Sequence, residues 1–183
     1  IRQKDGRNIF LLYDLALGEV MTPMYRLLVD LALKEALSTE ANGHTHLFLD
    51  ELKLLPKVTH LEDALNFGRS KRVSVVAGLQ SVGQIYATYG QEAGQVILGG
   101  FGSVIALNTG DYASRDYVTR LFGPNVTAYR YENGSHTPID RERDGFSVEH
   151  WHIQQLPPGH AVVGLASQAE PFYFYFEKDP YLR

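Results

Sequence analysis

Short apolar runs alternate along this chain with segments whose apolar residues recur at helical spacing. The apolar runs comprise residues 8–14, 45–50, 73–79 and 103–107. The segments expected to form helices comprise residues 24–37, 61–68, 81–89, 91–98 and 111–122. Strands that alternate with helices of this length form βαβ units, in which neighbouring strands run parallel and helices cover the sheet. The pattern therefore predicts an α/β fold with a mainly parallel sheet flanked by helices.

The pattern changes after Gly123 and Pro124, which together end the last of these helices. Strands are expected over residues 126–131, 161–166 and 172–176. We expect the last two of these strands to pair, and this β-rich part to form an antiparallel edge of the same sheet. The polar, charged segment 132–145 predicts a mobile loop. A length of 183 residues with 44% hydrophobic composition suits one core, so residues 1–183 are expected to form a single domain.

Composition narrows the classes of function. The chain has no cysteine, which excludes disulfides and thiolate metal sites. A formal net charge of −4 argues against a free-standing nucleic-acid binder, because such proteins are more often basic, although a local basic surface inside an assembly stays compatible with it. No apolar run approaches the roughly 18 residues of a membrane-spanning helix, and no signal peptide is evident. We therefore expect a soluble chain.

Two adjacent carboxylates, Asp50 and Glu51, stand at the end of the run 45–50. In open α/β sheets, ligands bind outside the carboxyl ends of the strands. A first carboxylate at such a strand end can hold Mg²⁺ through water, and a second can orient or deprotonate an attacking water. The alternative is that the pair only ends a strand and caps the next turn.

Arg69 belongs to the basic segment 68–72, which lies between an expected helix and an expected strand. The ordinary reading is a solvated basic turn. The functional reading is an arginine finger, since a planar guanidinium can stabilise charge on a transferring phosphoryl group.

Gln80 follows the apolar run 73–79, so it also lies at the carboxyl end of an expected strand. A neutral amide there can donate to a γ-phosphate and accept from a water. Alternatively, Gln80 only begins a helix, for which Ser81 is a natural N-cap.

The histidine pairs His44/His46 and His150/His152 each have the spacing of an extended metal-binding pair. The first pair precedes its strand, which is the wrong edge for a catalytic site, and no third ligand is evident near either. Trp151 and the aromatic run 172–176 are expected to pack in strands and core and not to form a base-stacking platform.

Three motifs occur in a fixed order: Leu-Phe-Leu-Asp-Glu at 47–51, Gly-Arg at 68–69 and Gly-Leu-Gln-Ser at 78–81. In that order and spacing the chain resembles the conjugative coupling proteins of type IV secretion, the TraG/TraD class of the FtsK/HerA-like RecA-fold ATPases. The resemblance covers residues 9–166 and is weakest over 132–145.

The resemblance implies part of a RecA-like P-loop NTPase core that uses ATP and Mg²⁺. By position in the motifs, Asp50 resembles the Mg²⁺-side acid and Glu51 the catalytic carboxylate. Gln80 resembles the γ-phosphate sensor, and Arg69 resembles the finger that acts across a subunit interface.

The same resemblance implies a homo-hexameric motor, anchored at the cytoplasmic face of the bacterial inner membrane by an N-terminal segment. It implies that ATP drives single-stranded DNA and its attached relaxase toward a type IV secretion channel, whose components are further partners.

The G-x-x-x-x-G-K-[ST] phosphate loop of such ATPases does not occur in these residues. Because Ile1 is followed almost at once by a strand pattern, we expect a fragment whose parent chain carries that loop and the membrane anchor upstream. The fragment alone is expected not to hydrolyse ATP. Two alternatives remain: a DNA-packaging or chromosome-translocating ATPase of the FtsK/HerA class, and a catalytically silent partner-docking domain.

Overall fold

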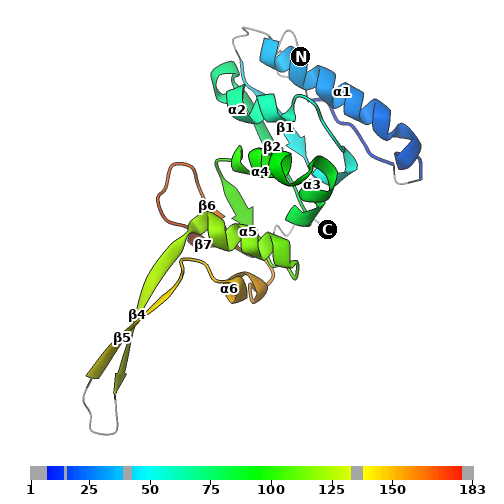
Figure 1. The fold of residues 1–183 in the computed structure, drawn as a ribbon. Coiled ribbons are helices and arrows are strands. Elements are labelled where there is room, and N and C mark those ends of the chain that lie inside the picture. The colour runs from blue at the N-terminus through cyan, green and yellow to red at the C-terminus, as the bar shows by residue number, and fades with distance from the viewer. Residues whose placement is uncertain (1–7, 15, 39–42, 133–137, 179–183) are drawn as a thin grey trace. The chain divides into compact units, whose positions relative to one another are not determined.

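The computed structural model describes residues 8–14, 16–38, 43–132 and 138–178 (Figure 1). The chain is mixed α/β, and its elements gather into two compact units, residues 1–101 and residues 102–183. The expectation of one domain over the whole chain stays a prediction.

The first unit contains mostly helices around one pair of strands. Its elements are α1 (Gly18–Ser38), β1 (Thr45–Leu49), the short 3-10 helix η1 (Leu52–Leu54), α2 (Leu61–Lys71), β2 (Val73–Ala77), α3 (Val82–Tyr89) and α4 (Gln91–Gly99).

β1 and β2 run parallel, from the pair Thr45 and Val73 to the pair Leu49 and Ala77, with α2 as the crossover. This part of the predicted βαβ organisation is confirmed. Only one face of the pair is covered by the described residues. On the other face, neighbouring side chains Phe48 and Val76 are 73% and 54% exposed. Parallel strands are usually covered on both faces. In the β1–β2 pair, the expected burial is observed on one face only.

α1 and α2 pack on each other, and α2 also packs on β2 (Figure 1). The Asp30 carboxylate of α1 accepts a hydrogen bond from the backbone N–H of His60 at 3.0 Å, at the start of α2. α1 begins ahead of its expected start at Met24 and includes Pro23. The largest fully buried side chains of this unit are Leu33, Leu52, Leu61 and Ile85.

Hydrogen bonds hold both ends of α3. The Ser81 hydroxyl accepts from the N–H of Gly83 at 3.1 Å, which confirms the expected N-cap. At the other end, the Tyr89 hydroxyl accepts from the N–H of Val58 at 3.1 Å. Burial raises the pKa of the Tyr89 phenol above its usual value, against the lowering effect of that hydrogen bond.

The second unit contains more strand than the first. Its elements are β3 (Val104–Ala106), α5 (Tyr112–Phe122), β4 (Pro124–Glu132), β5 (Pro138–Phe146), α6 (His150–Gln154), β6 (His160–Gly164) and β7 (Phe172–Tyr175). Its core contains Ala106, Val118, Val148, Ile153, Leu156 and Val162.

The prediction of a mainly parallel sheet is wrong. Among the described strands only β1 and β2 are parallel, and β3, β6 and β7 form an antiparallel sheet in that order. β3 pairs with β6 through Val104 and Gly164, which are far apart in sequence. An apolar run shows that a strand is buried but carries no information about which strand lies beside it. The predicted antiparallel pairing of the last two strands is correct.

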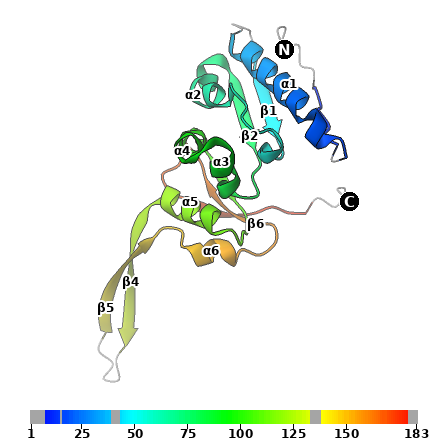
Figure 2. The same cartoon turned by 45° about the vertical axis from the view of Figure 1, so that its right-hand side comes forward.

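Two further expectations differ from the structure. Residues 8–14, expected as a strand, are described without regular secondary structure. Residues 138–145 of the expected loop lie in β5, which pairs with β4 from Pro124 and Phe146 to Glu132 and Pro138 (Figure 2). Residues 133–137 lie outside the described residues, and mobility of the segment stays a prediction. No helix in the described ranges has the length and hydropathy needed to cross a membrane.

Candidate functional site at the carboxyl end of the parallel strands

The residues after β1 and the residues after β2 lie side by side. The pairing of Leu49 with Ala77 continues beyond the strands, because the N–H of Gly78 donates to the Leu49 carbonyl at 2.8 Å. The Gly78 carbonyl then accepts from the N–H of Leu52 at 3.0 Å. The backbone on either side of Asp50 is therefore fixed to the segment that leads to Gln80.

Gly78 permits this close approach. A Cβ placed there would collide with the backbone carbonyl oxygen of Asp50. Sequence reasoning did not assign Gly78 a role of its own. The signal that points to it is a glycine between an apolar strand and a polar residue, which often marks a close backbone approach.

Asp50 and Glu51 occupy different environments although they are adjacent. Asp50 is exposed, whereas Glu51 is partly buried on extended backbone (φ −136°, ψ 96°). Glu51 Oε1 is buried and has no hydrogen-bond partner among the described residues. A buried carboxylate oxygen that is left unpaired is costly, so a water or another polar group would be a favourable partner for this atom.

Gln80 is exposed, one residue before the N-cap of α3. On α3, Gln84 Oε1 is also buried without a hydrogen-bond partner among the described residues. The structure thus brings Asp50, Glu51 and Gln80 to one end of the strand pair, as their positions in the sequence predicted.

Arg69 lies at the other end. It is exposed in the last turn of α2, just before β2 begins. The Arg72 carbonyl accepts from the N–H of Thr45 at 2.9 Å, which marks the amino end of both strands. The five residues of β2 separate the two ends by about 16 Å. The structure therefore does not bring Arg69 to the carboxylates and Gln80 of its own chain.

The donor set at the carboxyl end suits half of a magnesium–nucleotide site. Carboxylate oxygens are ligands that Mg²⁺ prefers, and this ion is commonly held by one or two carboxylates together with substrate phosphates. Within the described ranges, no cluster of three or more His, Cys, Asp or Glu side chains could hold a metal by itself. Asp50 and Glu51 would therefore need phosphate oxygens and water to complete a magnesium shell.

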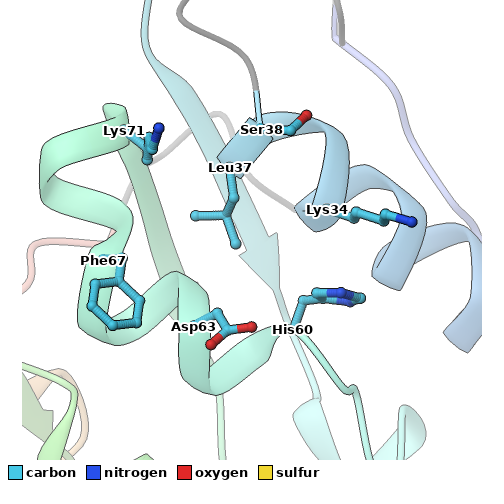
Figure 3. Close-up of a pocket in the computed structure, with 7 residues that line it drawn as sticks. All are labelled: Lys34, Leu37, Ser38, His60, Asp63, Phe67 and Lys71. Carbon is cyan, nitrogen blue, oxygen red and sulfur yellow. The ribbon is translucent and has the colours of Figure 1, made fainter.

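A hollow of about 360 Å³ on the first unit lies between α1 and α2 and not at the carboxyl end of the strands (Figure 3). Figure 3 shows Leu37 of α1 pointing into this hollow, with Phe67 and Asp63 of α2 facing it. Asp50, Glu51, Gln80 and Arg69 do not line it.

The segment His150–Trp151–His152 is helical, in α6, and not extended as expected. Trp151 is 54% exposed, so the expectation that it packs in the core is wrong. The side chains of the run 172–176 are also largely exposed.

Comparison with models of known protein families finds a match over most of the chain. Residues 1–164 match the model for the type IV secretion-system coupling protein DNA-binding domain. No curated protein matches the chain.

Solved structures of the coupling protein TrwB are similar to the chain. The unbound form of bacterial conjugative coupling protein TrwBdeltaN70 is 27% identical with a TM-score of 0.84, and the match covers 94% of this chain and 41% of that one. Plasmid coupling protein TrwB in complex with ADP and Mg²⁺ is 26% identical with a TM-score of 0.78, covering 96% and 41%.

A third structure, TrwB in complex with a non-hydrolysable ATP analogue, is 27% identical with a TM-score of 0.72, and covers 88% of this chain and 38% of that one. The chain thus spans about two fifths of the length of these structures. From the family match over residues 1–164, the chain belongs to the type IV secretion-system coupling protein DNA-binding domain family.

Proposed function

We propose that this chain is part of an ATP-driven motor that moves single-stranded DNA and its attached relaxase to a type IV secretion channel during conjugation. The single observation that carries the proposal is the convergence of Asp50, Glu51 and Gln80 at one end of β1 and β2, held by the close contact of Gly78 with Asp50. Family membership and the nucleotide complexes of TrwB support it.

In this proposal, bound ATP would supply the terminal phosphoryl group with ADP as the leaving group, and Mg²⁺ would offset the charge of the phosphates. Asp50, being exposed at the strand end, holds the metal side of the site through water. Glu51 presents its unpaired Oε1 to the attacking water, orients it and accepts its proton. Gln80 donates its amide N–H to the terminal phosphate.

Arg69 is proposed to act on the nucleotide of a neighbouring subunit. Its position at the amino end of the strands, with β2 between it and Gln80, favours action between chains over action within one chain. An exposed guanidinium at the end of a helix can reach across an interface and stabilise charge on a phosphoryl group. This role requires a ring, for which we propose a homo-hexamer.

The parent protein is proposed to be RecA-like and anchored at the cytoplasmic face of the bacterial inner membrane, with channel components as partners. The phosphate loop is proposed to lie in a part of the parent that this sequence does not include. The exposed apolar pair Phe48 and Val76 supports a further covering layer on that face of the strands. The 183 residues alone are accordingly proposed not to bind MgATP tightly or to hydrolyse it.

The test is Glu51→Gln in the longer protein that carries this sequence. Turnover of ATP should fall by a factor of about 10²–10⁴, the usual contribution of a positioned general base. Nucleotide affinity should stay the same, because the amide keeps the shape of the side chain. Steady-state phosphate release and equilibrium nucleotide binding measure the two effects separately.

Glu170→Gln, at an exposed residue of the second unit, is the matched control and should keep normal turnover. Near-normal turnover in Glu51→Gln would reject the catalytic assignment. A parent protein that neither binds nor hydrolyses ATP would instead favour the silent partner-docking domain.

A further inference from the structure

An exposed aromatic surface on the second unit takes no part in the proposed ATP site. Trp151 on α6 is 54% exposed, and its ring lies 3.8 Å, centroid to centroid, from that of His152. The His152 ring in turn meets Tyr173 of β7 edge-on at 6.3 Å, and Tyr173 is 58% exposed. Three neighbouring aromatic rings at the surface are typical of a binding surface and not of a core.

The rings are held in place by the core and by backbone hydrogen bonds. Ile153, the next residue of α6, is fully buried. The Nδ1 atom of His152 accepts from the backbone N–H of Glu149 at 3.0 Å, so the neutral ring carries its proton on Nε2. Glu149 Oε1 accepts from the N–H of Phe146 at 3.1 Å, so this carboxylate is engaged at the end of β5. The surface is therefore largely preorganised.

A hollow of about 440 Å³ adjoins these rings, where the paired strands β4 and β5 meet α6. Arg143 of β5 lines it together with Trp151 and His152. Side chains alternate between the two faces of a strand, which puts the neighbouring acids Glu142 and Asp144 on the opposite face from Arg143. Glu149 also lines the hollow, and its Oε1 is engaged by the N–H of Phe146. The hollow thus combines one guanidinium and one hydrogen-bonded carboxylate with flat aromatic faces.

Asn125 of β4 supplies an amide to the same hollow. Its Oδ1 accepts from the N–H of Val126 at 2.8 Å, which fixes the side chain and leaves the Nδ2 hydrogens to donate. The hollow therefore offers a stacking plane, a cation for a phosphate and a donor for a base edge. Aromatic stacking beside a cation is how proteins hold single strands without reading their sequence.

We propose that this surface binds single-stranded DNA, with a base stacked on Trp151, a phosphate at Arg143 and Asn125 donating to the base or sugar. The choice of DNA as the ligand rests on the proposed function. An acidic segment of a partner protein could use Arg143, but it would not need the flat face of Trp151 to be exposed. Single-stranded DNA uses both features.

The sequence provides a direct probe, because Trp151 is the single tryptophan of the chain. The 183-residue chain is titrated with a thymidine oligonucleotide of about 4–16 nucleotides, the usual span of one single-strand site. Tryptophan emission should be quenched as a base stacks on the indole. Anisotropy of a labelled strand gives the affinity independently.

Trp151→Ala should weaken binding about 5- to 150-fold, the loss of one stacked base, and Trp151→Phe should keep most of the affinity. Arg143→Ala should lower the slope of log affinity against log salt by about 0.7. Phe67→Ala, at a 61% exposed aromatic residue of the first unit, is the control and should bind normally. Circular dichroism checks that each variant is folded.

Binding of the labelled strand with unchanged Trp151 emission would overturn the proposal, and so would an absence of binding. If this surface instead binds a partner protein, the labelled strand should not bind. The titration contains no ATP, so its outcome is independent of the Glu51→Gln test. Quenching by DNA in a protein whose Glu51→Gln variant keeps normal turnover would reject the catalytic assignment and leave this inference standing.

Discussion

The two ends of the β1–β2 pair differ in charge. At the carboxyl end, Asp50 and Glu51 follow β1 and Gln80 follows β2, and Gly78 brings the two chain segments into contact. At the amino end, Arg69 is exposed in the last turn of α2, close in sequence to the basic residues Lys71 and Arg72. Opposite charges therefore stand about one strand length apart and cannot meet within one chain.

This difference shows how the two ends of one small sheet can take part in two different sites. The carboxyl end is suited to hold reacting groups because its backbone positions are fixed by hydrogen bonds from Gly78 to Leu49 and from Leu52 to Gly78. The amino end is suited to reach outward because Arg69 is exposed. Under the proposed function, the carboxyl end acts on the nucleotide bound to its own chain. The amino end acts on the nucleotide bound to a neighbouring subunit.

The largest effect is expected at the amino end. Arg69→Ala in the longer protein should lower ATP turnover by about 10³–10⁵-fold, the usual contribution of an arginine finger. Arg69→Lys should stay impaired, because an ammonium lacks the planar donor fork. Mixing the inactive Arg69→Ala and Glu51→Gln proteins should restore part of the activity, since some interfaces then contain an intact Glu51 and an intact Arg69.

Absence of recovery in the mixture would show that Arg69 serves its own chain, contrary to the separation of the two ends. Equal turnover in Arg69→Ala and the unchanged protein would remove the finger role altogether. Gel filtration of the mixture establishes that the subunits exchange.

A smaller effect is expected at the carboxyl end from Gly78→Ala. The added Cβ meets the Asp50 carbonyl oxygen, so the two segments must separate, which should lower the free energy of unfolding by about 1–3 kcal/mol. Gly99→Ala is the matched control, because no atom lies within 4 Å of a Cβ there and its effect should stay within about 0.5 kcal/mol. Urea denaturation measures both, and equal stabilities would mean that the close contact is not rigid.

The smallest change in stability is expected when one serine at each end of the strand pair is replaced by alanine. Ser81→Ala removes the N-cap of α3, next to Gln80, and should cost about 1 kcal/mol. Ser70 is exposed and donates to the Phe67 carbonyl at 2.9 Å within α2, so Ser70→Ala should change stability by less than about 0.5 kcal/mol. Thermal unfolding compares them, and a larger loss for Ser70→Ala would reverse the ranking of the two ends.

The alternation of apolar runs with helical segments was enough to predict β1, α2 and β2 and to place Asp50, Glu51 and Gln80 at one edge. Parallel strands joined by a crossover helix have their carboxyl ends on the same side, whatever the rest of the chain does. The N-cap at Ser81 was predictable for a similar reason, since the bonding groups are two residues apart.

Features that depend on distant segments were not predictable in this way. The antiparallel pairing of β3 with β6 and the long pairing of β4 with β5 depend on which strand lies beside which, and periodicity does not encode that choice. Trp151 was expected in the core because aromatic residues usually pack there, but the burial of Ile153 turns α6 so that the indole is exposed.

The sequence by itself therefore determined which side chains stand at strand and helix ends, because these positions follow from local periodicity and short-range hydrogen bonds. The tertiary structure alone decided that Gly78 touches Asp50, that Arg69 stands at the opposite end of β2, and that an exposed tryptophan lies beside Arg143. Each of these depends on contacts between segments far apart in the chain, which no local pattern specifies.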